Sequence, residues 1–342
     1  MSIKEALCRA LYTMALAMPL AWLPAGSSSA AEPPTVRFAA CGSCTAQGVE
    51  GLIIKQTNIA ELVGLKIDVL FLNPPQMGAG VASDSLDVEF VGAQPTLAQL
   101  ANNIPIKIVA FMYDFELRLE ALPPIKDIAE LKGKKIGVPF GTTAFKMASD
   151  IASKNGLPPG TLVNVAPADV GTALAGGQVS AVVIWDPLWG VIESTQKATP
   201  LDRRYHTGFT AMRAKFVEQN RDAAVRFLAA QMLAVAFRAN NHAEAAKRYE
   251  AAFGVAVDVA QAAQAIDRSR DWKTVEEVNL ELQAKDHQDL ADTMAFVVKE
   301  KLIPREVDIK SAIDASLVKD AKELLRSNKI GVAQVRYVNN LK

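Results

Sequence analysis

Strand and helix patterns alternate along the sequence from residue 36 to about residue 156. A short apolar strand pattern at 36–40 precedes a helical pattern at 49–62, and the same order returns where a strand pattern at 134–140 leads into a helix opened by Gly141. Alternation of this kind favours parallel strands, because each crossover helix covers one face of a sheet. The sequence therefore predicts an α/β fold with largely parallel strands. Further strand patterns lie at 66–72, 86–91 and 106–111, and short helices are expected at 76–82 and 128–131.

Two similar stretches indicate two α/β lobes. In each, small residues lead into a buried strand pattern, at 86–91 and at 181–184, and a proline follows. A chain of 342 residues is long enough for two cores. Beyond Phe216 the sequence is alanine-rich and helical, with polar faces typical of surface helices, which indicates a scaffold. The expected organisation is a first lobe at 32–115, a second lobe at 116–210, and a helical return to the first lobe with a C-terminal extension at 211–342.

The first 31 residues have the features of an export signal. Lys4 and Arg9 flank the start, an apolar run covers 10–23, and small residues fill most of 24–31. The run is shorter than the roughly 20 residues that span a membrane, which disfavours the alternative of an uncleaved anchor. We therefore expect cleavage after Ala31 and a periplasmic protein.

Composition and motifs exclude several function classes. The 37 basic and 37 acidic residues leave no positive excess for nucleic acid. No nucleophile elbow, phosphate loop or complete dinucleotide fingerprint occurs. The three histidines, His206, His242 and His287, are too widely spaced to suggest a metal site. We expect no catalytic residues, no metal, no cofactor and no nucleic-acid partner.

Cys41 and Cys44 are the two cysteines that would remain after signal cleavage, because Cys8 precedes the apolar run. In an oxidising compartment this Cys-x-x-Cys pair favours a disulfide. The alternative is a thioredoxin-like redox motif. That motif would have to open a helix in a thioredoxin-sized unit, and nothing downstream resembles the rest of such a fold.

Polar residues at two helix starts form a candidate anion site. Ser43 and Thr45 lie after the first strand pattern, and Thr142 and Thr143 lie after the strand pattern at 134–140. Helix starts carry unpaired N–H groups that can bind an anion; the alternative is that each hydroxyl only caps its helix. Four more candidates fall at or just past the ends of apolar strands, where α/β sheets bind ligands: Gln94, Tyr113, Trp185 and Asp186.

Each of these assignments has a structural alternative. Trp185 could be core packing, and Asp186 could form a turn before Pro187. Asp114 and Glu116 are left outside the site, because their carboxylates would repel an anion.

Four motifs follow one another along the chain: Gly80 to Val88 with Gly92 to Pro95, Leu131 to Thr143, Asp169 to Gly177, and Ala181 to Pro187. In this order they resemble the solute-binding proteins of ABC importers for nitrate, alkanesulfonates and taurine, in a superfamily that also binds thiamine pyrimidines. The resemblance covers roughly residues 35 to 215 and weakens in the helical C-terminal third. It implies a type II periplasmic binding fold, with two α/β lobes joined by a hinge.

The resemblance also implies a function. Such a protein binds a small solute between its lobes, here expected to be an anion such as a sulfonate, taurine or nitrate. It delivers the solute to an ABC permease of the inner membrane and its ATPase, and we expect a monomer. The positions that match the cleft of relatives are Ser43, Cys44, Thr45, Gln94, Tyr113, Thr142, Thr143, Trp185 and Asp186.

The sequence departs from the family at the paired cysteines, and no arginine lies in any cleft motif, which leaves open a ligand other than a simple sulfonate. A thiamine pyrimidine or a small carboxylate is the alternative ligand. A pyrimidine-synthesising enzyme would need a histidine and a cysteine-rich iron-site segment beside the cleft, and the sequence has neither. A regulatory effector domain is disfavoured because an export signal stands where a DNA-binding helix-turn-helix would be.

Overall fold

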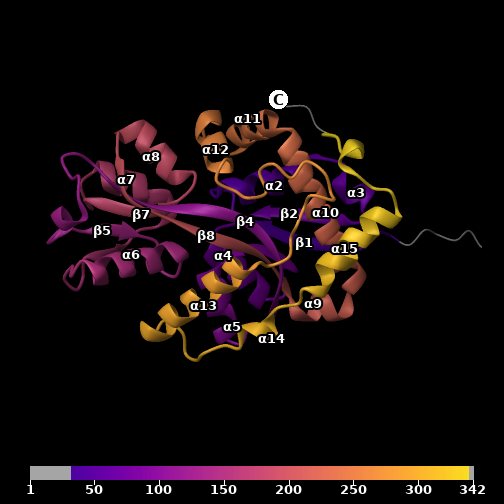
Figure 1. Ribbon diagram of the computed structural model, residues 1–342, viewed down its shortest axis with the longest axis horizontal. Coiled ribbons are helices and arrows are strands. Elements are labelled where there is room, and N and C mark those ends of the chain that lie inside the picture. Colours follow the sequence, from indigo (N-terminus) through magenta and orange to yellow (C-terminus); the bar gives the residue numbers. More distant parts are fainter. Residues whose placement is uncertain (1–31, 339–342) are drawn as a thin grey trace, which may run out of the picture. The chain divides into compact units, whose positions relative to one another are not determined.

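One mixed sheet of eight strands organises residues 32–338, the part of the chain that this computed structural model describes (Figure 1). The strand order is β2-β1-β3-β8-β4-β7-β5-β6. The predicted export signal lies outside the described residues. The strands are β1 (Thr35–Ala40), β2 (Lys66–Phe71), β3 (Val88–Gly92), β4 (Ile106–Ala121), β5 (Ile136–Val138), β6 (Leu162–Asn164), β7 (Ala181–Trp185) and β8 (Thr199–Arg213).

Helices connect and cover these strands. No helix within residues 32–338 combines the length and the hydropathy needed to cross a membrane. Short 3-10 turns lie at Ile128–Leu131, Pro167–Asp169 and Val332–Gln334. The α-helices are α2 (Thr45–Gln56), α3 (Ile59–Leu62), α4 (Pro74–Ala82), α5 (Ala93–Ala101), α6 (Thr143–Lys154), α7 (Val170–Ala175), α8 (Leu188–Gln196), α9 (Ala214–Gln219), α10 (Arg221–Asn240), α11 (His242–Phe253), α12 (Val257–Gln264), α13 (Ala284–Lys299), α14 (Ile309–Ala312) and α15 (Ser316–Ser327).

The sheet is parallel toward its edges and antiparallel in its centre. β1 pairs in parallel with β2 and β3, and β5 pairs in parallel with β6 and β7. The three central pairings, β3 with β8, β8 with β4, and β4 with β7, are antiparallel. The expectation of largely parallel strands is therefore wrong for the centre. The strand pattern at 106–111 continues to Ala121, and β8 lies where the sequence analysis assigns no strand.

β4 and β8 run together through the whole sheet. The start of β4 pairs with the end of β8 beside β3, at Ile106 and Arg213, and the end of β4 pairs with β7. We call the strands β2, β1 and β3 with their helices the β1 half, and β7, β5 and β6 with theirs the β5 half. The two long strands are the segments of the sheet that both halves share.

The helical C-terminal third is more buried than the sequence suggests. α10 packs against α2 and α15 and is buried on nearly all of its sides from Ala223 to Ala239. Its alanines present little bulk, which allows close helix contacts around the full circumference. The expectation of polar surface faces is therefore wrong for α10, whose Arg238 is among the largest fully buried side chains.

α2 begins earlier than its sequence pattern predicts. The apolar spacing predicts a helix over 49–62, whereas α2 starts at Thr45 and ends at Gln56. At the break before α3, the Thr57 hydroxyl donates to the Ile53 carbonyl. The earlier start places Thr45 and Gln47 in the first turn of a helix, directly after Cys44.

Candidate ligand-binding site

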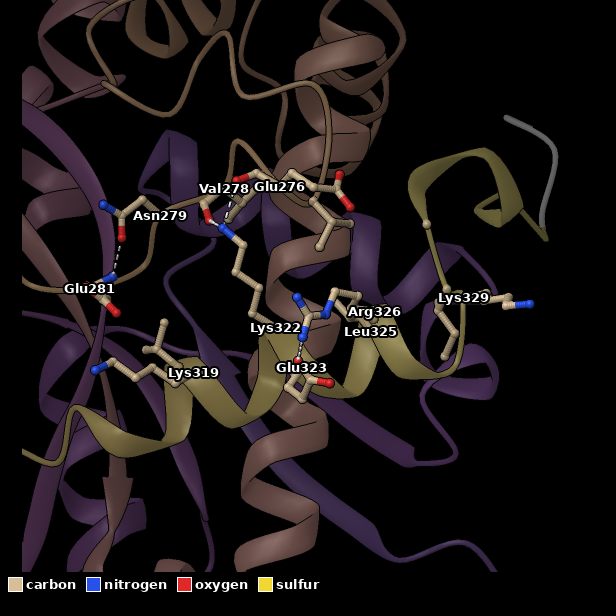
Figure 2. Close-up of a pocket in the computed structure, with 14 residues that line it drawn as sticks. Glu276, Val278, Asn279, Glu281, Lys319, Lys322, Glu323, Leu325, Arg326 and Lys329 are labelled. Atoms are coloured by element: carbon tan, nitrogen blue, oxygen red, sulfur yellow. Dashed lines mark hydrogen bonds and ion pairs between the residues drawn. The ribbon is translucent and has the colours of Figure 1, made fainter.

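A wide cavity lies between the irregular segment at 275–281 and α15 (Figure 2). Its volume is about 600 Å³, and charges of both signs line it. Lys322 donates to the carbonyls of Glu276 and Val278, and Arg326 pairs with Glu323. None of the residues matched to the family cleft lines this cavity, so it is not the site that the sequence predicts.

A smaller cavity lies over the middle of β4 and draws on both halves of the fold. Gly92 and Pro95 come from the β1 half, and Thr142, Thr143 and Trp185 come from the β5 half. The free volume is about 40 Å³, far below the roughly 150 Å³ of a dry cavity that holds benzene. The lining residues are Cys44, Gln47, Pro74, Gly92, Pro95, Tyr113, Phe115, Thr142, Thr143 and Trp185. We call this cavity the cleft.

Five of the nine residues matched to the family line the cleft: Cys44, Tyr113, Thr142, Thr143 and Trp185. The other four lie elsewhere. Ser43 is exposed, whereas Thr45, Gln94 and Asp186 are buried but do not line the cavity. Tyr113 lies in the middle of β4, so the expectation that it ends a strand is wrong.

Five lining residues were not among the predicted site residues: Gln47, Pro74, Gly92, Pro95 and Phe115. The strand pattern carries a signal for one of them. Phe115 follows Tyr113 by two residues on one strand, so both side chains point to the same face once β4 is extended. Gln47 precedes the apolar spacing that marks α2, which begins at Val49, so that spacing carries no signal for it.

Tyr113 forms the floor of the cleft. Its hydroxyl accepts a hydrogen bond of 3.1 Å from Gln47 Nε2, and its ring lies 5.1 Å from that of Phe115. The paired residue on β8 is Gly208, where an added Cβ would overlap the Tyr113 ring. A residue larger than glycine at position 208 would therefore clash with the Tyr113 ring.

The start of α6 meets the end of β3 across the cleft. An added Cβ on Gly92 would lie 3.0 Å from the Thr143 hydroxyl. The neighbouring hydroxyl of Thr142 donates to the Pro139 carbonyl over 2.7 Å. Thr142 is thus engaged in its own turn, whereas the Thr143 hydroxyl makes no hydrogen bond to any described residue.

Trp185 also lines the cleft. Its indole Nε1 is buried and has no hydrogen-bond partner among residues 32–338. A buried N–H without a partner is rare, because its desolvation costs about 1–3 kcal/mol. Trp185 Nε1 and the Thr143 hydroxyl are therefore polar groups without a described partner on two residues that line the cleft.

Asp186 lies behind the cleft, at the start of α2. Its carboxylate accepts from the Glu116 N–H over 3.4 Å, and the hydroxyl and N–H of Thr45 also favour its charged form. Burial is the larger influence and raises the pKa of Asp186 to about 7. The positive end of α2 therefore already faces the carboxyl group of Asp186.

The electrostatic surroundings of the cleft are neutral to acidic. None of its lining residues carries a charged side chain. Burial raises the pKa of Tyr113, and the nearby carboxyl groups of Asp186, Asp267 and Glu50 raise it further. The Asp114 carboxylate is held by Arg268, which leaves it outside the cleft. A bound anion would thus depend on N–H and O–H donors alone.

Comparisons with known proteins identify the family. Residues 62–245, more than half of the chain, match the family described as NMT1/THI5 like. The chain belongs to this family. A Bacillus subtilis protein, assigned by its name to aliphatic sulfonate binding, is 28% identical over 278 residues. The match covers 77% of this chain and 80% of that protein.

Solved structures show the same fold in this NMT1/THI5-like protein and in periplasmic binding proteins. The alkanesulfonate-binding protein of Xanthomonas axonopodis pv. citri, bound to MOPS, superposes with a TM-score of 0.67. It is 18% identical, and the match covers 84% of this chain and all of that one. The desulfurization enzyme DSZB shares the fold at a TM-score of 0.65 and 14% identity, over 85% of this chain and 99% of its own. The fold therefore serves both binding proteins and an enzyme.

Proposed function

We propose that this protein is the solute-binding component of an ABC importer and that it captures a small solute in the cleft. One observation carries the proposal: uncommitted polar groups of Thr143 and Trp185 meet Tyr113 and Gln47 in a cavity lined from both halves of the fold. The similarity to sulfonate-binding proteins supports it. On this proposal the protein binds its solute and catalyses no reaction.

The proposed solute is a small anion of the sulfonate, taurine or nitrate type. The start of α6 supports an anion, because its first N–H groups and the Thr143 hydroxyl lie at the cleft. The free volume of about 40 Å³ is too small for an alkanesulfonate. We therefore propose that the β1 and β5 halves separate to admit the solute and close over it, with β4 and β8 as the connections between them.

A pyrimidine is the second candidate ligand. The rings of Tyr113, Phe115 and Trp185 line the cleft, and no cation does. Aromatic walls with a few hydrogen-bonding groups suit a flat, neutral heterocycle at least as well as an anion. The two ligand classes differ in charge, so one binding experiment separates them.

The proposed setting is the periplasm. The pattern at 1–31 supports export, and the solved structures with this fold include a periplasmic aliphatic sulphonate-binding protein from Escherichia coli. On this proposal the solute-loaded protein docks on an inner-membrane permease with its ATPase and acts as a monomer. Light scattering of the purified protein measures the last point directly.

Thermal unfolding with a ligand panel tests the proposed function. The panel contains MOPS, taurine, nitrate, a small carboxylate and an aminopyrimidine. A ligand at a hundredfold excess over Kd stabilises the folded state by about 2.7 kcal/mol, which raises the Tm of a protein of this size by about 4 °C. We expect such a shift for one member of the panel, with calorimetric titration giving a one-to-one stoichiometry.

The panel also decides between ligand classes. A shift with MOPS or taurine supports the sulfonate proposal, and a shift with the pyrimidine alone replaces it with the second candidate. Glycerol and chloride at the same concentrations serve as controls for non-specific stabilisation. A flat response to the whole panel contradicts the solute-binding proposal.

A further inference from the structure

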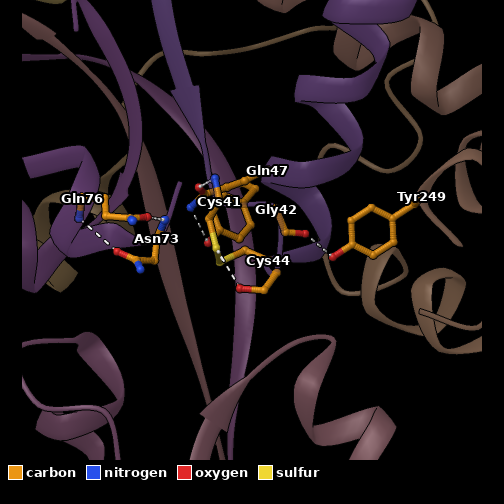
Figure 3. Close-up of a disulfide and its surroundings, with 9 residues drawn as sticks. Cys41, Gly42, Cys44, Gln47, Asn73, Gln76 and Tyr249 are labelled. Atoms are coloured by element: carbon orange, nitrogen blue, oxygen red, sulfur yellow. Dashed lines mark hydrogen bonds between the residues drawn. A yellow bond between two sulfur atoms is a disulfide. The ribbon is translucent and has the colours of Figure 1, made fainter. Parts of the chain in front are cut away.

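The turn between β1 and α2 is closed by a covalent bond at the edge of the cleft. The sulfur atoms of Cys41 and Cys44 form a disulfide (Figure 3). Cys41 is the residue after β1 and is fully buried, whereas Cys44 is the N-cap of α2 and lines the cleft. The bridge therefore joins the end of a strand to the start of the helix that contributes Gln47 to the site.

Hydrogen bonds connect this turn to Tyr113 at the floor of the cleft. The Cys41 N–H donates to Gln47 Oε1 over 2.9 Å, and Gln47 Nε2 donates to the Tyr113 hydroxyl. On the other side of the turn, the Gly42 carbonyl accepts from the Tyr249 hydroxyl over 2.9 Å. A shift of Cys41 relative to α2 would therefore move the Gln47 amide and release Tyr113.

Without the disulfide, hydrogen bonds alone connect the two ends of the turn, through the Gln47 side chain and between the backbones of Cys44 and Cys41. The Cys44 N–H donates to the Cys41 carbonyl over 3.3 Å, near the long limit for such a bond. α2 is buried from Thr45 to Ile54, which keeps the helix packed on the core when the bridge is absent. Loss of the bridge should therefore loosen the first turn of α2 while the core stays folded.

We propose that the Cys41–Cys44 disulfide positions the cleft, so that the oxidised protein binds its solute and the reduced protein binds it weakly. This inference rests on the proposed function for the identity of the site. Cys41 and Cys44 are positioning residues here, because they act on the ligand through Gln47 and Tyr113. The bridge thereby couples the redox state of the surroundings to solute capture.

The reduction itself is a two-electron exchange with a dithiol. A thiolate of the reductant attacks Cys44 Sγ, the sulfur at the cleft, and forms a mixed disulfide while Cys41 leaves as a thiolate. The second thiol of the reductant then releases Cys44 and closes the disulfide of the reductant. Two electrons and two protons pass to the protein. Ser43 Oγ lies 3.5 Å from Cys41 Sγ and can donate a hydrogen bond to the leaving thiolate.

Thermodynamic linkage between solute binding and disulfide reduction makes a quantitative prediction. If reduction weakens solute binding by a given factor, bound solute must make the disulfide harder to reduce by the same factor. A tenfold change in affinity corresponds to a change of about 30 mV in the reduction potential of this two-electron couple. The two measurements must agree if the coupling is real.

The test compares oxidised protein, protein reduced with dithiothreitol, and the Cys41→Ser/Cys44→Ser variant. The first readout needs no ligand: it is hydrogen exchange of the Gly48 amide, which donates to the Cys44 carbonyl over 2.8 Å. We expect at least tenfold faster exchange after reduction and in the variant. The second readout is the Kd for MOPS, expected to rise at least fivefold on reduction.

Control variants distinguish the effect of the bridge from effects of Cys8, the reductant and Ser43. The double variant treated with dithiothreitol accounts for Cys8 and for effects of the reductant. Ser43→Ala keeps the bridge and should leave MOPS affinity unchanged while slowing reduction. If the double variant does not fold, the chemically reduced protein still gives both readouts.

The outcomes keep the two proposals apart. Unchanged Gly48 exchange, or equal MOPS affinity in both redox states, overturns the inference. Faster Gly48 exchange with no MOPS binding in either state supports the positioning role and counts against the sulfonate as ligand. Faster exchange together with weaker MOPS binding supports both proposals.

Discussion

Two adjacent threonines at the start of α6 have different roles. Thr142 is the N-cap residue, and its hydroxyl is committed to the Pro139 carbonyl. Thr143 faces Gly92 across the cleft and has no such partner. Thr142 therefore stabilises the loop, whereas Thr143 faces the proposed ligand site. The distinction arises from side-chain direction, which the sequence motif does not contain.

Valine substitutions test this division at the residue scale. Thr143→Val keeps the side-chain shape but removes a donor to the ligand, so we expect MOPS affinity to fall about tenfold with little change in Tm. Thr142→Val loses an internal hydrogen bond of about 1 kcal/mol, so we expect Tm to fall by about 1–2 °C and affinity to change less than threefold. Calorimetric titration and thermal melts measure the two effects. Equal affinity in Thr143→Val and the unsubstituted protein would remove Thr143 from the site.

At the scale of elements, α10 contacts α2 through a buried cluster of ionisable side chains. Arg238 lies 3.1 Å from Glu50 of α2 and 2.7 Å from Asp267, and all three are buried. Asp267 also accepts from the Asp114 N–H, directly after Tyr113 in β4. The C-terminal third, expected to be a scaffold, thus contacts both elements that carry the floor of the cleft.

Removing the cation of this cluster should strongly destabilise the protein. Arg238→Leu leaves two buried carboxyl groups without their partner, a change that costs about 3–5 kcal/mol and lowers Tm by about 5–8 °C. Arg326→Leu is the matched control, because its pair with Glu323 is exposed and worth less than about 1 kcal/mol. Thermal and urea unfolding of both variants measure the difference. Similar losses in the two variants would mean that burial of the cluster does not matter.

At the scale of the whole molecule, buried carboxyl groups make folding pH-dependent. Burial raises the pKa of Glu50 and Glu120 to about 8 and that of Glu89 and Asp186 to about 7. Between the unfolded values near 4 and these folded values, the folded state binds more protons than the unfolded state. Its free energy of unfolding therefore falls as the pH rises.

We accordingly expect Tm to fall between pH 5.5 and pH 8.5. Glu89→Gln should flatten this dependence, because Glu89 is fully buried and neither of its carboxylate oxygens makes a hydrogen bond to a described residue. The salt-bridged Asp87 has a lowered pKa, whose contribution is lost only in acid and stays constant across this range. Thermal melts at intervals of half a pH unit measure the slope. A Tm that rises with pH would contradict these burial effects.

Several local elements and the family could be predicted from the sequence alone. Short-range patterns carry that information, because apolar spacing and helix-starting residues act within a few positions along the chain. β2, α4 and the turn at Ile128–Leu131 begin within two residues of their predicted starts. Motifs from Gly80 to Pro187 indicated the family to which the chain belongs, and they contain Thr142, Thr143 and Trp185, three of the five predicted site residues that line the cleft.

The way these parts meet could not be predicted from the sequence. The long central strands β4 and β8, the burial of α10 and the placement of Asp267 depend on pairings between residues that are far apart in the sequence, such as Ile106 with Arg213. The same holds for the cleft, where Asp186 reaches the start of α2 and Gly208 makes room for Tyr113. Such contacts leave no local pattern, because each residue type is equally compatible with a turn, a core or a site until its distant neighbours are in place.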